Sequence, residues 1–426
     1  MIDRVEALDR SSRLIQDYVE ADADTITDTL TSTVVRLVAD DETLATRAGR
    51  TAVLTSFETI ARLGVQLKID IPAKDAAELP PGYLGADLNT ALSTRAQSLI
   101  TPATTEGECD LTISLSAKRP GRGTISIGGT DTTTRARIGA SAGGWHGTLP
   151  LGAGLAGAAA GAEVARSIIN KLRDGSPSRG RFWSEHRPFD LSLPHLNAPA
   201  PIDLGTVDFV SAGAITHATL FLLSQTEQLT LNGRIFDDEA ASIDNLNRYL
   251  LLTQHDLDTS KATHLAQLTS SRWNLTGIER RINDASSLPD GTTLANNLCV
   301  GVDSVGARWT CQQLAPDWVG VGATTHSFAM ASDHPAGAAC AACVHPLDEQ
   351  PAERLPTISF VTLMAATLLT HRLIEHATNP QTHATRFVAL NAFNLASPPT
   401  MQLETTSRNP ACPLNCQSQD TAQHTS

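Results

Sequence analysis

The 426-residue sequence lacks several features that would assign it to a class at once. No uninterrupted apolar run is long enough to cross a bilayer, because the longest candidate, 149–165, is interrupted by glycines. The net charge is −13, so the basic surface typical of nucleic-acid-binding proteins is missing. The first residues, MIDRVEALDRSSR, are too charged for a secretory signal. We therefore expect a cytoplasmic protein with neither a membrane nor a nucleic-acid partner.

Aromatic residues are also scarce, at 4% of the chain. The core must therefore be built mainly from alanine, leucine, valine and isoleucine. Hydrophobic residues make up 41% of the sequence and charged residues 18%, proportions that suit a globular protein and exclude a disordered one. The length suffices for two or three domains, each with its own core.

Cysteine is the next informative residue type, with seven in the chain. An odd number that includes a C-x-x-C pair favours metal binding over disulfides in a reducing compartment. Cys340 and Cys343 form one pair, and Cys412 and Cys416 form a second pair near the end of the chain. Two such pairs suit a tetrahedral four-cysteine Zn²⁺ site with a structural role, since four thiolates leave no open position for catalysis. Four free, buried thiols are the alternative.

The strongest positive signal runs from 207 to 308. An apolar strand, VDFV, enters a glycine-containing turn and a helix, and a second strand, RIF, ends in acidic residues. The segment DNLNR follows, then Lys261, and a later apolar strand, LCVGV, ends in Asp303. This order predicts a nucleotide-binding α/β unit whose aspartates, asparagine, arginine and lysine can hold ATP and a metal ion together. A nicotinamide dehydrogenase is disfavoured, because no acid and base pair for hydride transfer is visible.

The same order of elements occurs earlier in the chain, which indicates a twofold repeat of architecture. We expect 51–64 to be a short strand, a turn at Thr55 and Ser56, and a helix, with a third strand that ends at Ser116. This predicts an α/β fold of two Rossmann-like domains in one chain, the first a degenerate copy of the second. The predicted boundaries are 1–45 for N-terminal helices, 46–175 for the degenerate domain, 176–204 for a linker, 205–416 for the working domain with the zinc site, and 417–426 for a disordered tail.

The segment DDEAASIDNLNRY resembles the D-x-D-x-V-x-x-S-N-L-x-R-Q motif of the E1-like (ThiF/MoeB/ubiquitin-activating) superfamily of adenylating enzymes. The resemblance covers 205–416 well, and it implies a pseudo-dimer of two ThiF-type domains whose N-terminal half is inactive in adenylation. It implies adenylation of the C-terminal glycine of a ubiquitin-like protein with ATP and Mg²⁺. It further implies onward transfer to an E2-like protein in a bacterial conjugation pathway such as antiphage defence, with a homodimer left open.

Roles for individual residues follow from this resemblance. Gly213 would let phosphates approach a helix N-terminus, and Asp237 would accept from the ribose hydroxyls. Arg248 and Lys261 would hold the phosphates, and Asp303 would bind Mg²⁺. The remaining implied site residues are Asn245, which would help hold the phosphates, and an N-terminal arginine, either Arg13 or Arg10. Taken singly, these residues could equally be helix caps, packing turns and solvated charges.

The sequence departs from the family pattern at several positions. The glycine motif is SAGAIT, which keeps only its middle glycine, while Glu239 and Tyr249 replace an aspartate and a glutamine. The segment after Cys343 carries no cysteine to form a thioester, which leaves Cys311 as a weak candidate. Two alternatives therefore stay open: adenylation of a sulfur carrier or a peptide, and a non-catalytic scaffold that binds a ubiquitin-like protein or an E2-like protein.

Overall fold

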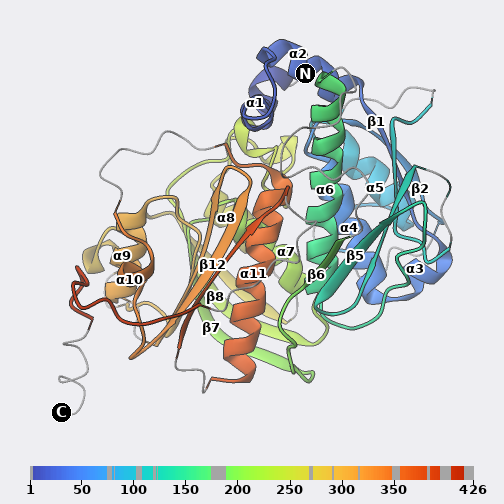
Figure 1. Cartoon of the computed structure of the whole chain (residues 1–426). Coiled ribbons are helices and arrows are strands. Elements are labelled where there is room, and N and C mark those ends of the chain that lie inside the picture. Colours follow the sequence, from blue (N-terminus) through green and yellow to red (C-terminus); the bar gives the residue numbers. More distant parts are fainter. Residues whose placement is uncertain are drawn as a thin grey trace.

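Two β-sheets, one from each half of the chain, face each other across a layer of long helices in the computed structural model (Figure 1). We refer to 3–192 as the N-terminal half and to 202–416 as the C-terminal half. The structure describes 3–73, 79–80, 82–101, 108–118, 121, 123–173, 189–267, 272–289, 292–314, 317–347, 356–380, 384–393 and 404–416. The predicted disordered tail, 417–426, lies outside the described residues. Residues 176–188 of the predicted linker also lie outside them.

The N-terminal half contains a six-stranded sheet in the order β2-β1-β3-β4-β5-β6. Strands β1 to β4 are parallel to one another, and β5 and β6 are antiparallel additions. Its elements are α1 (Arg4–Gln16), α2 (Ala23–Ser32), β1 (Val34–Val38), α3 (Asp41–Ala45), α4 (Arg47–Ala61), β2 (Gln66–Asp70), α5 (Leu88–Gln97), β3 (Leu111–Ser114), β4 (Thr124–Gly129), β5 (Thr133–Ile138), α6 (Leu151–Leu172) and β6 (Phe189–Ser192).

The C-terminal half contains an eight-stranded sheet in the order β14-β13-β12-β11-β10-β7-β8-β9. Its elements are β7 (Ile202–Val210), α7 (Ala214–Ser224), β8 (Leu229–Phe236), η1 (Ile243–Asn245), η2 (Gln254–Asp256), α8 (Lys261–Ala266), β9 (Trp273–Ile278), η3 (Ala285–Ser287), β10 (Asn297–Val300), α9 (Val305–Leu314), β11 (Trp318–Thr325), β12 (Phe328–Pro335), α10 (Ala341–Val344), α11 (Ser359–Thr378), β13 (Thr385–Asn391) and β14 (Glu404–Thr406).

The two sheets share one topology, which confirms the predicted fold class of two Rossmann-like α/β domains. The order β2-β1-β3-β4-β5-β6 in the first sheet corresponds to β8-β7-β10-β11-β12-β13 in the second, with β9 and β14 added at the edges. The long helices α6 and α11 occupy corresponding places and run side by side at the centre of the molecule (Figure 1). Within the described ranges, no helix is both long enough and apolar enough to span a bilayer.

The internal alignment predicted for the first half was wrong at its start. Val34–Val38, which we expected to lie in a helix, forms β1, because its β-branched residues suit a strand that pairs on both sides. The predicted strand and turn of 51–64 are instead part of the continuous helix α4, so β1 and α4 are the counterparts of β7 and α7. The segment predicted as a linker, 176–204, contains β6, which pairs with β5 in the first sheet.

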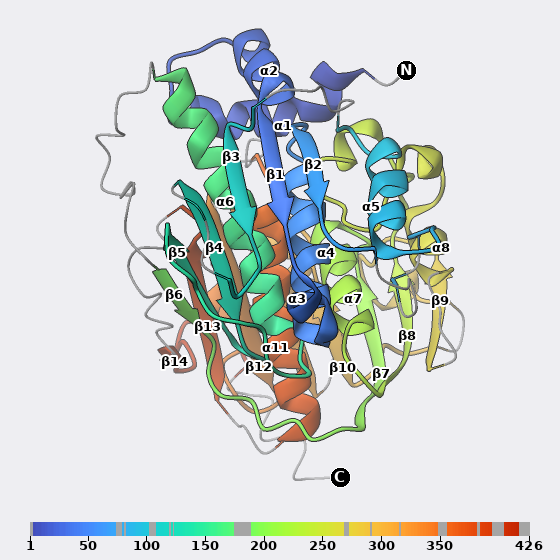
Figure 2. The same cartoon turned by 90° about the vertical axis from the view of Figure 1, so that its right-hand side faces the viewer.

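The two halves are joined where α6 packs against α4 and α11. Helix α6 is rich in glycine and alanine, so the backbones of its neighbours approach it closely. Thr55 and Thr59 of α4 donate hydrogen bonds from their hydroxyls to the carbonyls of Ala153 and Gly157, each at 2.7 Å. Figure 2 shows α4 and α6 behind the strands of the first sheet. Thr55, predicted to lie in a nucleotide turn, is therefore a packing residue.

We predict that Gly157→Ala destabilises the protein. The added Cβ would lie 2.5 Å from Cβ and 2.7 Å from the backbone carbon of Thr55, so α4 itself must move. Overpacking costs about 1–3 kcal/mol, which exceeds the gain in helix propensity of about 1 kcal/mol. Urea denaturation should therefore show a lower free energy of unfolding, while Ser167→Ala on the more exposed face of the same helix should show no loss. Equal stability of the two variants would contradict this close packing.

Candidate active site

A cavity of about 310 Å³ lies beyond the carboxyl ends of β7, β8 and β10. Strand β7 is the first strand of its sheet, and the chain adds β8 on one side of it and β10 on the other. The carboxyl ends at such a switch point form a crevice in open α/β sheets. Residues from every part of the predicted motif line this cavity, and α1 of the N-terminal half contributes Arg10.

The turn between β7 and α7 forms one wall of the cavity. Ser211 adopts a left-handed backbone conformation, with φ of 78°, at the position where the family pattern has its first glycine. Gly213 caps α7 without a side-chain hydrogen bond, so the first amides of this 11-residue helix face the cavity beside a residue that has no Cβ. A helix N-terminus of this kind is suited to an anion.

Asp237, at the end of β8, fixes this turn against the second strand. One carboxylate oxygen accepts from the amide of Ala212 at 2.8 Å, and the other accepts from the amide of Glu239 at 2.9 Å. Burial raises the pKa of Asp237, and the Glu239 amide and the Lys261 charge offset part of that shift. The carboxylate borders the cavity, where its remaining lone pairs can accept hydrogen bonds from a ribose.

Two cations predicted to hold phosphates, Arg248 and Lys261, lie against the same aromatic ring. The guanidinium carbon of Arg248 is 5.1 Å from the centroid of Tyr249, and the Lys261 ammonium is 5.5 Å from it. Lys261 also pairs with Glu239 at 2.7 Å, and Tyr249 and Glu239 raise its pKa against the lowering effect of burial. The tyrosine that replaces the family glutamine thus makes a cation–π contact with each of the two cations.

Asn245 does not line the cavity and instead closes the preceding turn. Its side-chain oxygen accepts from the amide of Ser242 at 3.1 Å, and its amide donates to Asp244 at 3.1 Å. The carboxylate of Asp244 in turn lies 3.2 Å from the Arg10 guanidinium. Asn245 therefore shapes the loop that carries Arg248, and no atom of its side chain is placed for direct phosphate contact.

The structure separates the two candidate N-terminal arginines. Arg10 lines the cavity and has only 17% of its side chain exposed, whereas 56% of the Arg13 side chain is exposed. Arg13 pairs with Asp9 one turn earlier on α1, away from the cavity. Of the two arginines implied by the resemblance, the fold thus brings Arg10 to the cavity and leaves Arg13 mostly exposed beside Asp9.

Asp303 lies on an exposed loop after β10 and lines the cavity together with Arg248. The loop is held by Arg308, which donates to the carbonyls of Val302 at 3.1 Å and Asp303 at 3.3 Å. The sequence reasoning missed this contact and also missed Arg281, which borders the cavity and pairs with Asp238. Arg308 and Arg281 each lie several residues beyond the end of a strand, and neither belongs to a motif that the sequence analysis recognised.

Neither Cys299 nor Cys311 is placed as a nucleophile. Cys299 lies in β10 and Cys311 on the inner face of α9, and both are buried. Burial raises the pKa of the Cys299 thiol well above its ordinary value and that of Cys311 to about 12, so neither forms a thiolate readily. The weak candidate of the sequence reasoning, Cys311, is therefore unsuited to accept an acyl group.

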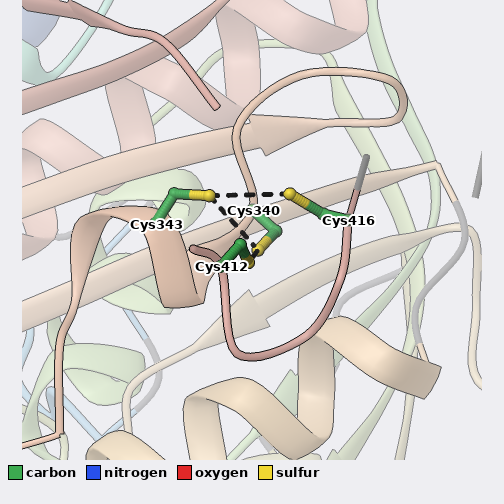
Figure 3. Close-up of side chains that lie close together, drawn as sticks. All are labelled: Cys340, Cys343, Cys412 and Cys416. Carbon is green, nitrogen blue, oxygen red and sulfur yellow. Dashed lines mark hydrogen bonds between the residues drawn. The ribbon is translucent and has the colours of Figure 1, made fainter. Parts of the chain in front are cut away.

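The four paired cysteines converge at the start of α10 (Figure 3). Their sulfur atoms all lie within 4.8 Å of one another, with the Cys340–Cys412 pair at 3.4 Å and the Cys343–Cys416 pair at 3.5 Å. Four sulfurs bound about 2.3 Å from one tetrahedral ion lie about 3.8 Å apart, so the arrangement is compatible with zinc. The cluster therefore joins the segment that carries Cys412 and Cys416 to α10, which lies about 70 residues earlier in the sequence.

Comparison with known proteins gives the family of this region. The model of the ThiF family matches residues 227–414. This part of the chain is a ThiF family domain. The match begins after β7 and α7. Strand β7 belongs to the same sheet as the matched strands, and both β7 and α7 contribute residues to the same cavity.

Individual proteins resemble the chain more distantly. The uncharacterized protein y4jF of Sinorhizobium fredii is 27% identical over 219 residues, which cover 46% of this chain and 39% of that protein. The crystal structure of E. coli MccB with ATP matches 49% of this chain and 66% of its own, at 16% identity and a TM-score of 0.39. The structure of the microcin C7 biosynthetic enzyme MccB with N-formylated MccA matches at 15% identity, also with a TM-score of 0.39, over 49% of this chain and 67% of its own.

We predict that Gly213→Ala weakens binding of ATP to the ThiF domain about tenfold or more. Its Cβ would lie 2.9 Å from the Ser211 hydroxyl and 3.5 Å from the Gly301 carbonyl, on the wall that phosphates must approach. Calorimetric titration with a non-hydrolysable ATP analogue and Mg²⁺ measures the change. Ser211→Gly is the companion variant, since it removes a side chain from the same turn, and it should bind at least as tightly as the unmodified protein. Unchanged affinity in Gly213→Ala would contradict this placement of the phosphates.

We predict that the purified protein contains about one zinc ion per chain and that a chelator lowers its melting temperature, because a structural site contributes to folding free energy. Cys412→Ser should lose the metal and melt at a lower temperature. Cys109→Ser, which changes a thiol outside the cluster, is the matched control and should retain both. Elemental analysis without zinc, together with a melting temperature insensitive to chelator, would contradict the prediction.

Proposed function

We propose that the chain uses ATP and Mg²⁺ to adenylate the C-terminal glycine of a ubiquitin-like protein. The observation that carries this proposal is the convergence of cations and carboxylates on one cavity of a ThiF family domain. The cations include Arg10, Arg248 and Lys261, and the carboxylates include Asp237 and Asp303. General ATP-dependent adenylation follows from the family, and the protein substrate is the finer part of the proposal.

The donor set suits the reaction. Asp303 offers an exposed carboxylate at the mouth of the cavity, the hard oxygen ligand that Mg²⁺ prefers, and the ion would supply charge neutralisation of the phosphates. Arg248 and Lys261 supply further positive charge from buried positions, where it is screened least. Asp237 would orient the ribose and so hold the α-phosphate near the amides of α7.

The reaction requires no general base, because a C-terminal carboxylate is already ionised at neutral pH. A carboxylate oxygen of the substrate attacks the α-phosphorus of ATP and forms a new P–O bond. The bond from that phosphorus to the bridging oxygen breaks, and pyrophosphate leaves with the electron pair. The products are an acyl-adenylate and pyrophosphate. The cations lower the repulsion between two anions as they approach.

The buried state of Cys299 and Cys311 supports a reaction that stops at the acyl-adenylate on this chain. Onward transfer in a bacterial conjugation pathway would then use a thiol of another protein, with an E2-like protein as the proposed partner. Adenylation of a sulfur carrier or of a peptide uses the same groups. It is the second candidate because it also needs no cysteine on this chain.

We further propose that the N-terminal half does not bind nucleotide. At the carboxyl ends of its parallel strands, Asp40 is bonded to Ser116 and Thr43, and the Trp145 indole donates to the carbonyl of Leu115 at 3.0 Å. Trp145 is 2% exposed and fills the space beside the strand ends. These groups support a degenerate role for this copy of the fold.

ATP–pyrophosphate exchange in the presence of a ubiquitin-like protein with a free C-terminal glycine tests the proposal. We expect exchange that depends on this glycine and falls about 10²-fold or more in Asp303→Ala, in line with loss of one electrostatic group. Asp190→Ala, at a surface pair of the other sheet, is the control. ATP binding without exchange for any ubiquitin-like protein, sulfur carrier or peptide would instead favour the non-catalytic scaffold.

A matched pair on α1 tests the arginine from the N-terminal half in the same assay. Arg10→Ala should lower the exchange rate, because its guanidinium borders the cavity. Arg13→Ala should have little effect, since it removes a surface charge paired with Asp9. The reverse order of effects would assign the role to Arg13 instead.

A further inference from the structure

The loop that carries Arg248 is buried although, after Asn245 at the end of η1, it has no regular secondary structure. We define this segment, 245–252, as the arginine loop. Leu246, Leu250 and Leu252 are fully buried, yet their carbonyls belong to neither a helix nor a sheet ladder. Buried backbone carbonyls need hydrogen-bond donors, because leaving one unpaired costs about 1–3 kcal/mol.

Two arginines of the N-terminal half supply these donors. Arg62, at the end of α4, donates to the carbonyls of Leu246 at 2.6 Å, Leu250 at 2.9 Å and Leu252 at 2.8 Å. Arg95 of α5 donates to the carbonyl of Leu250 at 2.7 Å. The planar guanidinium of Arg62 thus bridges three points of the arginine loop, on both sides of Arg248.

One carboxylate neutralises both arginines. Glu58 accepts from Arg62 at 2.8 Å, from Arg95 at 2.9 Å and from the hydroxyl of Tyr83 at 2.6 Å. The side chains of Glu58 and Arg62 are 0% exposed and that of Arg95 is 1% exposed. Burial raises the pKa of Glu58, but the charges of Arg95 and Arg62 outweigh it and hold this pKa below its ordinary value.

Such a cluster is a costly way to gain stability. Removing charges from water costs several kcal/mol each, and well-packed apolar residues of similar volume often give equal or greater stability. What the apolar residues cannot do is bind three specific carbonyls at once. The arrangement therefore favours a positioning role over a purely stabilising one.

We propose that Glu58, Arg62 and Arg95 form a clamp through which the N-terminal half holds the arginine loop and thereby sets the position of Arg248 at the cavity. The clamp residues do not line the cavity, so they act through the loop. The consequence for catalysis rests on the proposed adenylation activity, whereas the holding of the loop does not. The N-terminal copy of the fold would thus have exchanged nucleotide binding for support of its partner.

The test uses the full-length protein and a conservative variant. Arg62→Lys keeps the charge beside Glu58 but presents a single ammonium that cannot reproduce the planar fork. Arg166→Lys is the matched control, because Arg166 is also a buried arginine of the N-terminal half that pairs with a glutamate and donates to a carbonyl, that of Phe393 at 2.8 Å. A triple variant that combines Arg62→Met, Arg95→Met and Glu58→Gln tests the removal of the whole cluster, because it leaves no buried charge behind.

Hydrogen exchange of the arginine loop is the first readout and requires no substrate. The amides of Arg248, Tyr249 and Leu252 are bonded to carbonyls within this segment, and the amide of Leu246 is bonded to the carbonyl of Ile243 just before it. We expect them to exchange at least tenfold faster in Arg62→Lys, with no matching change in β7 or α7. The triple variant should show the same local effect. Unchanged protection in both clamp variants, or an equal rise of exchange in β7 and α7, would overturn the proposal.

The second readout is the exchange of ATP with pyrophosphate. Displacement of Arg248 should lower kcat/KM roughly 10–100-fold in Arg62→Lys, and Arg166→Lys should keep the unmodified value. Loosened amides in Arg62→Lys with unaltered kcat/KM would overturn the positioning of Arg248. If the unmodified protein shows no exchange activity, the proposed function fails, and the affinity for an ATP analogue with Mg²⁺ then serves as the readout for the clamp.

Discussion

The close packing of α6 against α4 and α11 is the constraint on which the rest of the structure depends. Glycines along α6 allow the threonine hydroxyls of α4 to reach its backbone carbonyls. At Gly161 the approach of α11 is so close that an added Cβ would lie 2.7 Å from Cβ of Phe360. Two sheets with the same strand order are thereby fixed on opposite sides of the helix layer through one continuous core. Helices α4 and α5 come to lie against the C-terminal half, and α1 reaches its cavity.

This rigid contact explains how two unequal copies of one fold can share a single site. The C-terminal half supplies the turn, the strand ends and most charges, all within one ThiF family domain and its first strand and helix. The N-terminal half supplies Arg10 at the cavity and buried arginines behind the arginine loop. The cavity therefore depends on residues that are far apart in the sequence, such as Arg10 and Asp244, which are 234 positions apart. It also depends on a closely packed interface between the two halves.

The site itself shows how much a sequence motif can predict. Gly213, Asp237, Arg248, Lys261 and Asp303 all lie at the cavity. Four of them follow a strand or a turn or open a helix whose local pattern is strong, and Arg248 lies in the loop that the motif DNLNR marks. The four cysteines converge for a similar reason, since their spacing fits one tetrahedral ion. Asn245 and Arg13 do not border the cavity, because a motif gives the order of residues and leaves the direction of each side chain open.

The sequence by itself determined β7, α7, β8 and β10 in the C-terminal half and the cysteine cluster, since these rest on local strand, turn and spacing patterns. It also indicated the repeat, but it misplaced the first strand, because β1 is a strand only through its pairing with β2 and β3. Only the tertiary structure decided that Arg10 faces the cavity and that Glu58, Arg62 and Arg95 meet the arginine loop. Contacts of this kind join segments that are far apart in the chain, and a local pattern of residues cannot predict which distant group will pair with a buried charge.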